Sequence, residues 1–290
     1  MNEIEIILVN DNSEDNSLRI IENLQKDDKR IKIINNKKNK GTLYSRSIGV
    51  LQSKGKYILP LDNDDMFFDE DVFDFVYKEA EDFNYDITGF KVIQANNYKA
   101  RINEMQDGCH MHNNSFTVNQ PELGLFGISE KNRFKIVEVH IWSKCIKNYI
   151  YKKAVNALGS EKYSLFLSWA EDTSMVFILF NIAQSYRYVT KYGIFRLNRK
   201  FSASESMPNS HKLFGDIFFL DVIFDFSKNN FESKKFAVYK AINIKNGIYF
   251  SSLDKNNLKF LKFVLKKLLS CQYISNEDKI ILKINFKGYI

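Results

Sequence analysis

YILPLDNDD, residues 57–65, is the stretch that decides the fold of this chain. An apolar run leads there directly into three carboxylates, Asp62, Asp64 and Asp65. Continuous apolar runs are typical of buried parallel strands, and ligands gather at the carboxyl ends of such strands. Crowded carboxylates repel one another unless a cation lies between them, and hard divalent cations prefer oxygen ligands. The stretch therefore predicts a metal that holds a nucleotide diphosphate; the alternative is an acidic loop after an edge strand.

Short apolar segments alternate with helical patterns on both sides of this stretch. This alternation is typical of a layered α/β fold with a mostly parallel sheet flanked by helices. We expect strands at 4–9, 31–34, 57–61 and 87–92, and helices ending near 24 and covering 42–52 and 70–83.

The second half of the chain has a different pattern. Residues 141–155 are expected to be helical, an apolar helix to begin near Glu171, and 193–197 to form a strand. From Pro208 onward the sequence is helical, aromatic and rich in lysine. We therefore predict a catalytic domain over residues 1–207 and a helical C-terminal appendage over 208–290.

Composition limits the class of protein. With 290 residues, of which 44% are hydrophobic, the chain can bury a sizeable core. Three cysteines indicate reduced thiols and a cytoplasmic setting. The net charge of +7 fits a phosphate-bearing substrate or an anionic membrane surface. No helix-turn-helix, zinc-finger or RNA-binding signature is present, so we expect no nucleic-acid partner.

Several motifs, taken in order, resemble the family 2 glycosyltransferases, which have a GT-A fold. The quoted segments are IILVNDNSEDNS (6–17), NKGTLYSRSIG (39–49), GKYILPLDNDD (55–65), WSK (142–144), AED (170–172) and FRLNRKFS (195–202). The resemblance runs from residue 3 to about residue 205. It implies a sugar transfer from a nucleotide sugar, with UDP as the expected nucleotide, to an acceptor hydroxyl. The acceptor would be a glycan, a lipid-linked molecule or a protein.

The resemblance also implies roles for the matching residues on the donor side. Asp11 would recognise the base, because a carboxylate accepts a hydrogen bond from an imide N–H; otherwise it caps a helix. Arg46 would face the base or a phosphate, or remain a solvated helix charge. Asp62 would hold the ribose or a water, and Asp64 would ligate Mg²⁺ or Mn²⁺, which offsets charge on the leaving diphosphate.

On the acceptor side, Asp172 would be the general base, with Glu171 as the second candidate. A positioned base contributes about 10²–10⁴-fold to a rate. The structural alternative is that both carboxylates only stabilise a helix N-terminus. Trp142 and Lys144 would line the acceptor site or belong to the core. Arg196, Arg199 and Lys200 would grip the diphosphate or form a solvated basic loop.

Two further features have weaker functional interpretations. Cys109, His110 and His112 have a spacing seen in zinc sites, but a structural site needs four ligands and no second pair is nearby. The helix expected over 258–269 carries lysines on an amphipathic pattern, which indicates either peripheral contact with an anionic membrane or packing on the catalytic domain.

The chain also departs from the family pattern. The family's first strand and helix precede the segment at which this sequence begins, and that strand lies inside the sheet. We therefore expect an unfilled strand position, explained by a truncated sequence, by a strand from another chain or by loss of activity. The strand-like segment 280–286 is one candidate to fill it. An inactive remnant that binds a glycan or a partner is the alternative function, and a nucleotidyl-type enzyme is a third.

Overall fold

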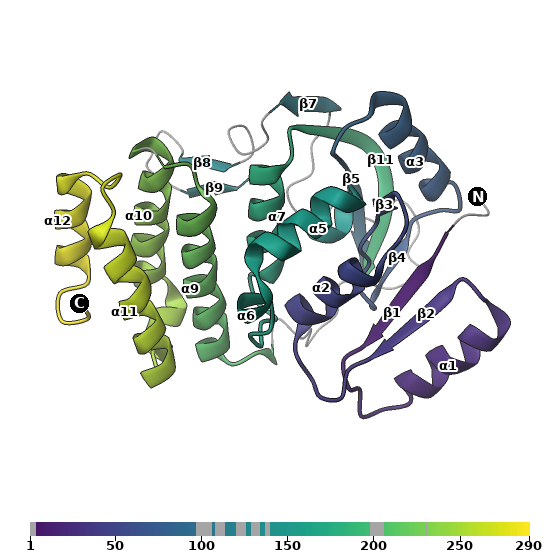
Figure 1. The fold of residues 1–290 in the computed structure, drawn as a ribbon, viewed down its shortest axis with the longest axis horizontal. Helices are drawn as coiled ribbons and strands as arrows, with labels where there is room; N and C mark the ends of the chain where they lie inside the picture. Colours follow the sequence, from purple (N-terminus) through teal and green to yellow (C-terminus); the bar gives the residue numbers. More distant parts are fainter. Residues whose placement is uncertain are drawn as a thin grey trace. The chain divides into compact units, whose positions relative to one another are not determined.

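Figure 1 shows the computed structural model, which describes residues 4–96, 106–107, 114–119, 126–128, 134–136, 140–197, 206–229 and 231–290. The chain forms two compact units. The first comprises Met1–Pro121, His140–Leu167 and Ile182–Lys200; the second comprises Glu122–Val139, Ser168–Asn181 and Phe201–Ile290. The division expected from the sequence was a single boundary at residue 207. The second unit instead also includes Glu122–Val139 and Ser168–Asn181, which precede that boundary.

The first unit begins with a small parallel sheet. Strands β1 (Ile6–Asn10) and β2 (Ile31–Asn35) pair from Ile6 opposite Ile31 to Asn10 opposite Asn35, and α1 (Ser17–Asp27) connects them. Helix α2 (Thr42–Gln52) packs against β1: a Cβ added to Gly49 would lie 3.4 Å from Val9 Cγ2. The short α2–β1 distance is possible because glycine has no side chain at this crossing.

A larger sheet forms the centre of the first unit. Its order is β3 (Tyr57–Ile58), β10 (Lys144–Lys147), β5 (Ile87–Ala95), β11 (Ser185–Leu197) and β4 (Asp65–Phe67). Two short strands extend it: β6 (Gln106–Asp107) pairs with β5, and β7 (Phe116–Asn119) pairs with β11. Along this order only β5 and β11 run parallel. The remaining elements are α3 (Val72–Phe83), η2 (Ile141–Ser143), α5 (Asn148–Leu158) and α6 (Ser160–Tyr163). The α/β class with a sheet flanked by helices is confirmed.

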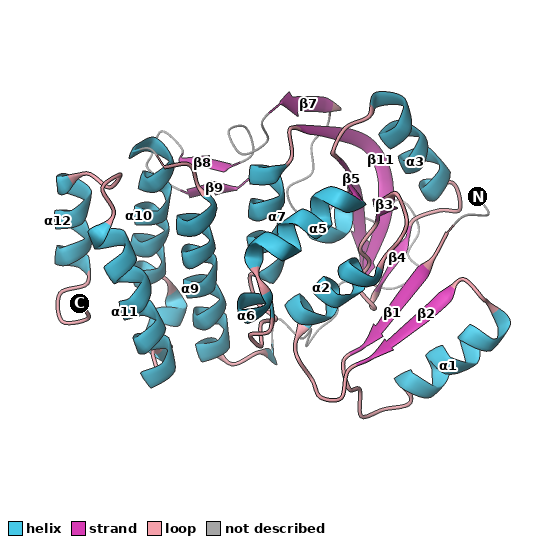
Figure 2. Ribbon diagram, in the orientation of Figure 1, coloured by secondary structure: helices cyan, strands magenta, loops and turns pink. Residues whose placement is uncertain are grey.

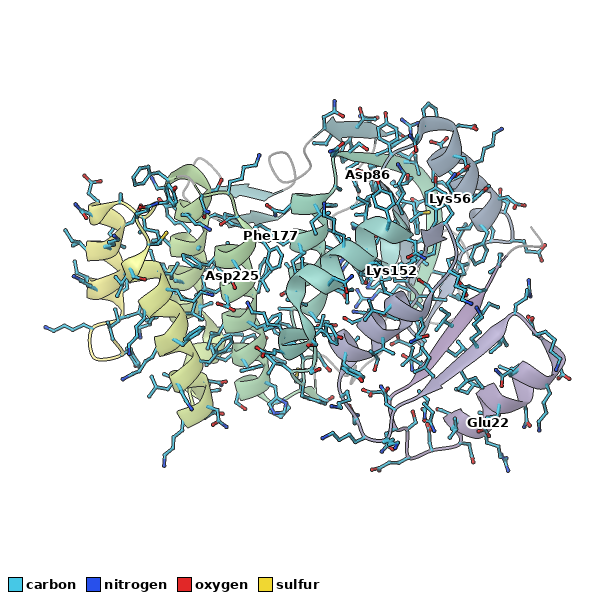
Figure 3. The ribbon with its side chains drawn as sticks, in the orientation of Figure 1. Glu22, Lys56, Asp86, Lys152, Phe177 and Asp225 are labelled. Carbon is cyan, nitrogen blue, oxygen red and sulfur yellow. The ribbon has the colours of Figure 1, made fainter. Side chains whose placement is uncertain are left out.

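Asp86, labelled in Figure 3, lies just before β5 and ties three strands of this sheet together. Its carboxylate accepts hydrogen bonds from Lys147 Nζ at 3.1 Å, from the Tyr149 hydroxyl at 3.2 Å and from Gln184 N at 2.8 Å. These donors come from β10, α5 and the residue before β11. Because a buried polar group is costly without hydrogen-bond partners, these three bonds hold Asp86 in place, and Asp86 in turn fixes the ends of neighbouring strands.

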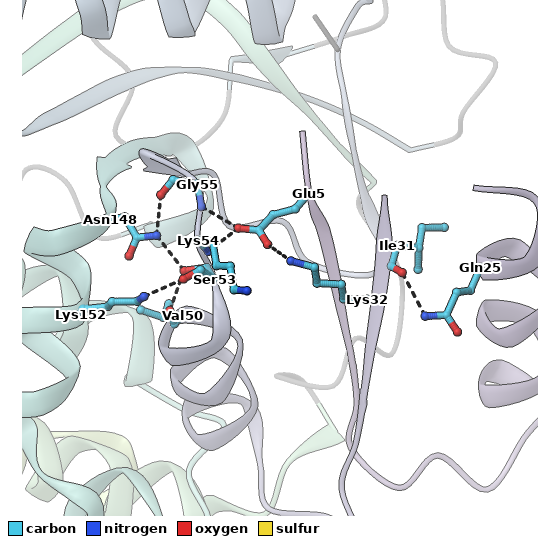
Figure 4. A network of polar contacts seen from close by, with 10 residues as sticks. All are labelled: Glu5, Gln25, Ile31, Lys32, Val50, Ser53, Lys54, Gly55, Asn148 and Lys152. Carbon is cyan, nitrogen blue, oxygen red and sulfur yellow. Dashed lines mark hydrogen bonds and ion pairs between the residues drawn. The ribbon is translucent and has the colours of Figure 1, made fainter. Parts of the chain in front are cut away.

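Glu5 links three segments of the first unit, as Figure 4 shows. Its carboxylate accepts hydrogen bonds from the backbone N–H of Gly55 at 2.6 Å and of Lys54, and from Lys32 Nζ at 2.5 Å. Burial alone would raise the pKa of the Glu5 carboxyl, but these donors outweigh burial and lower it below its ordinary value. The start of β1 is thereby attached to β2 and to the turn before β3.

Strands β1 and β3 each have an edge that pairs with no other strand in the described part of the chain. β1 pairs with β2 alone, and β3 with β10 alone. On the β2 side, Ile6 N donates to Arg30 O and Asn10 O accepts from Asn36 N, so the backbone groups of alternate residues face the other edge. β2 and β4 likewise pair with one strand each, so such edges mark the ends of the two sheets.

The second unit is mainly helical (Figure 2). It contains α7 (Glu171–Ile182), α9 (Asn209–Phe226), α10 (Phe231–Asn246), η3 (Ile248–Ser252), α11 (Lys255–Ser270), α12 (Asn276–Asn285) and the pair β8 (Phe126–Ile128) and β9 (Phe134–Ile136). Phe177 of α7 is at the centre, with its ring 6.1 Å from those of Phe219 on α9 and Phe236 on α10. None of the described helices has the length and apolar character needed to cross a bilayer.

Three expectations about secondary structure are wrong. The strand expected over 57–61 ends at Ile58, because Pro60 has no N–H to donate to a ladder. Residues 141–155 are not one helix, since pairing with β5 draws residues 144–147 into a strand. Residues 280–286 do not form a strand that fills the sheet, because 276–285 are helical and Ser275 caps the helix by accepting from Asp278 N.

Candidate active site

Asp11 holds the loop that follows β2. Its Oδ1 accepts hydrogen bonds from Asn36 Nδ2 at 2.8 Å and from Lys40 N at 2.9 Å, and its Oδ2 accepts from Gly41 N at 2.7 Å. Asp11 does not cap α1, whose N-cap residue is Asn16. Three donors use three of about four acceptor positions of a carboxylate, so one remains for a ligand.

Gly41 allows this loop to pass close to another part of the first unit. Its φ is +86°, and an added Cβ would lie 3.0 Å from the backbone N and O of Leu167. The N–H of the neighbouring Leu43 donates to Leu167 O at 3.3 Å. Because an alanine at this position would be strained and crowded at once, only glycine suits the turn that leads into α2.

We expect Gly41→Ala to lower the free energy of unfolding by about 2–4 kcal/mol, from backbone strain plus overpacking. Gly159→Ala is the matched control, since its φ is +82° but nothing lies within 4 Å of an added Cβ. In that variant the free energy of unfolding should fall only by the cost of backbone strain, about 1–2 kcal/mol. Urea unfolding of both variants measures the difference, and equal losses would show that the contact with Leu167 does not matter.

The acidic cluster lies in the turn between β3 and β4. Asp62, Asp64 and Asp65 each offer an oxygen, and these oxygens lie within 4.8 Å of one another. The turn is closed by Asp65 N donating to Asp62 O at 3.1 Å. All three side chains are partly exposed. An all-oxygen set of this size suits a hard cation such as Mg²⁺ or Mn²⁺ that keeps further positions for water and phosphate.

One arginine bonds to the cluster, and a second lies on the strand that pairs with Asp65. Arg46 of α2 donates through Nη2 to Asp62 Oδ1 at 2.5 Å. Arg196 of β11 is the register partner of Asp65 on β4, and its guanidinium carbon lies 5.9 Å from the centre of the Trp142 ring. The structure therefore brings the guanidinium of Arg46 to carboxylates that suit a cation, and a guanidinium is well shaped to bind a polyphosphate.

The two candidates for the acceptor side are both buried. Trp142 is 5% exposed and stacks on His140 with ring centres 4.5 Å apart. Lys144 is fully buried, and its Nζ donates to His140 O at 2.5 Å. These positions match the core interpretation of both residues, since a sugar that stacks on an indole needs one accessible face.

Glu171 and Asp172 form the first turn of α7, in the second unit, and α7 begins at Glu171 as expected. Ala170 precedes them with a left-handed φ of +58°. Its carbonyl accepts from Ser174 N at 2.9 Å and from Ser174 Oγ at 2.7 Å. A strained residue held by a buried serine fixes the direction in which the helix starts.

The structure does not describe every predicted site residue. Arg199 and Lys200, and the Cys109–His112 segment considered for zinc, lie outside the described residues. Two contributors escaped the sequence interpretation: Asn36, which bridges Asp11 and Ser45 Oγ, and His140, which contacts Trp142 and Lys144. Asn36 follows β2 as Asp11 follows β1, and this shared position at the ends of parallel strands was a usable signal.

Comparison with known proteins agrees with this geometry. A model of the family described as "Glycosyl transferase family 2" matches residues 1–140. This segment belongs to glycosyl transferase family 2. An uncharacterized glycosyltransferase of Haemophilus influenzae is 25% identical over 193 residues, which are 66% of this chain and 70% of that protein.

Other relatives and solved structures are similar to parts of this chain or to its fold. The GalNAc(5)-diNAcBac-PP-undecaprenol beta-1,3-glucosyltransferase of Campylobacter jejuni is 39% identical over 64 residues, 22% of this chain and 21% of that protein. S. aureus TarS 1-349 in complex with UDP-GlcNAc has a TM-score of 0.65 at 13% identity, covering 98% of this chain and 78% of that one. GalNAc-T7 with UDP, GalNAc and Mn²⁺ has a TM-score of 0.56 at 15% identity, covering 98% and 52%. The fold is therefore GT-A-like.

Proposed function

We propose that the protein transfers a hexose-type sugar from a UDP-linked donor to an acceptor hydroxyl, with inversion at the anomeric carbon. The observation that carries the proposal is the convergence of Asp62, Asp64 and Asp65 within 4.8 Å, with Arg46 bonded to Asp62. Support comes from the family 2 segment and from GT-A-like neighbours that were solved with UDP or UDP-GlcNAc.

In this proposal the donor is held by residues of the first unit. Asp64, with Asp62, holds the Mg²⁺ or Mn²⁺ ion, which when bound stabilises negative charge on the departing diphosphate. Arg46 and Arg196 add fixed positive charge on the same side, and Arg199 is a further candidate. Asp11 uses its remaining acceptor position for the nucleotide base.

The acceptor hydroxyl is activated by Asp172, which takes its proton as the oxygen attacks the anomeric carbon. The bond from that carbon to the diphosphate oxygen breaks at the same time, and UDP leaves with the electron pair. The transition state has oxocarbenium character. Glu171 is the second candidate for the base. A glycan, protein or lipid-linked acceptor fits this chemistry, and the printed name of the Campylobacter relative, which includes PP-undecaprenol, favours a lipid-linked one.

Thermal unfolding of the full chain with and without UDP and Mn²⁺ tests the proposal. Ligand at about 100 times its Kd adds about 2.7 kcal/mol, a rise of several degrees in Tm for a protein of this size. We expect a shift that needs both UDP and the metal. The choice of UDP would be contradicted if UDP with Mn²⁺ left the Tm of a cooperative transition unchanged, while GDP or CMP with the metal raised it.

One observation favours a second candidate, an inactive glycosyltransferase that binds a glycan or a partner. In the described part of the chain, β1 and β2 form a sheet of their own that pairs with no strand of the larger sheet containing β3 and β4. Metal-dependent release of UDP from any UDP-sugar would exclude this candidate, because a binding module does not turn over its ligand.

A further inference from the structure

Helix α12 presents isoleucines to solvent. Ile280, Ile281 and Ile284 are 56%, 41% and 70% exposed, whereas Leu282 and Phe286 are fully buried. At 3.6 residues per turn the three isoleucines fall in a sector about 100° wide. Helix α12 therefore packs one side into the protein and exposes an apolar stripe on the other. An exposed apolar stripe of this kind marks a surface that binds a membrane or another protein.

Positive charge is concentrated around this helix. Residues 255–290 contain eight lysines, no arginine and two acidic residues, so they supply +6 of the formal net charge of +7. On α11, Lys255, Lys259, Lys262 and Lys266 recur every three or four residues and are exposed. In the described part of the chain only Lys267 of the eight forms an ion pair, with Asp221 at 2.5 Å and Asp225 at 2.6 Å.

Helix α11 itself does not offer an apolar face. Its Leu261, Val264, Leu265 and Leu268 are fully buried within the second unit. The membrane contact considered from the sequence of 258–269 therefore cannot use the apolar stripe of that helix. What α11 presents to solvent is its lysine row with Phe263, which is 55% exposed.

We propose that α12 and the lysines of residues 255–290 bind the surface of an anionic lipid bilayer. The isoleucine face of α12 would enter the boundary between headgroups and acyl chains, and the lysines would contact lipid phosphates. Charge complementarity selects this occupant: a second copy would bring the same +6 against it. All the basic residues of 255–290 are lysines. A lysine ammonium is a point charge, which suits many mobile anionic headgroups, whereas an arginine fork suits a fixed carboxylate or phosphate that it binds through two hydrogen bonds.

The test is binding of the full chain to phosphatidylcholine vesicles with and without phosphatidylglycerol, measured by co-sedimentation at low salt. We expect binding only where the anionic lipid is present. The triple variant Ile280→Ser, Ile281→Ser, Ile284→Ser should bind at least about tenfold more weakly, from lost apolar burial. The control Ile20→Ser, Leu24→Ser removes apolar residues of α1 that are 55% and 50% exposed, and should bind like the wild type.

A second set of variants tests the charge independently. Lys279→Gln, Lys283→Gln, Lys287→Gln should weaken binding about 100-fold at low salt, and added salt should reduce that difference. Equal binding to neutral and anionic vesicles, or no effect of either triple variant, would overturn the proposal. The proposal would also be overturned if the wild type were a dimer, and the isoleucine variant were a monomer that bound vesicles as well as the wild type. The isoleucine face would then join two copies of the chain. None of these readouts needs donor or acceptor, so the outcome is independent of the proposed activity.

Discussion

Asp64→Ala is expected to lower kcat for sugar transfer by about 10²–10³-fold and to abolish the metal-dependent rise in Tm with UDP. The reason is that Asp64, whose oxygen lies within 4.8 Å of those of Asp62 and Asp65, is the carboxylate that we propose to hold the cation. Without the cation, the negative charge that develops on the diphosphate has only the nearby arginines as partners.

The matched control is Asp82→Ala, which removes an exposed carboxylate of α3 in the same unit. It should leave kcat and the ligand-induced shift unchanged. Steady-state rates at saturating donor, together with melts with and without Mn²⁺, provide both readouts. A variant at Asp64 that retains its metal-dependent shift would show that the cation is held elsewhere.

The second prediction concerns Asp172→Asn, which should lower the transfer rate by about 10²–10⁴-fold while leaving the UDP- and metal-dependent Tm shift intact. Asparagine keeps the shape of aspartate and one side-chain carbonyl oxygen in the first turn of α7, so the helix should form as before. What it loses is the basic oxygen that takes the proton of the acceptor.

Glu171→Gln serves as the comparison for that assignment. If Asp172 is the base, the glutamine variant keeps most of its transfer rate; the reverse pattern assigns the base to Glu171. Two variants that both transfer at the wild-type rate would mean that the first turn of α7 has only the structural role of stabilising a helix N-terminus.

Several features near the candidate site could be predicted from local sequence. Asp11 directly follows the apolar strand β1, and the acidic cluster follows the apolar run that contains β3. The helix over Thr42–Gln52 has the predicted bounds, because Gly41 stops the preceding loop and supplies the left-handed φ that starts the turn. These signals lie within a few residues of the feature that they predict.

Strand pairing could not be predicted in the same way. Residues 144–147 have a sequence compatible with helix, and their ladders with β5 and β3 make them a strand. Likewise, Arg196 is the register partner of Asp65, 131 positions earlier in the chain, because β11 pairs with β4. Propensity is a weak prior beside such pairing, since long-range hydrogen bonds and burial outweigh it.

The sequence by itself determined the α/β class, the acidic cluster and the start of α7 at Glu171, because each depends on apolar periodicity or on residues adjacent in the chain. Only the tertiary structure decided that Asp11 holds the loop before α2, that Trp142 and Lys144 are buried, and that isoleucines of α12 face solvent. The burial and the hydrogen-bond partners of a residue depend on which distant segments pack together. That packing is stabilised by contacts across the whole fold, so no single segment of the sequence determines it.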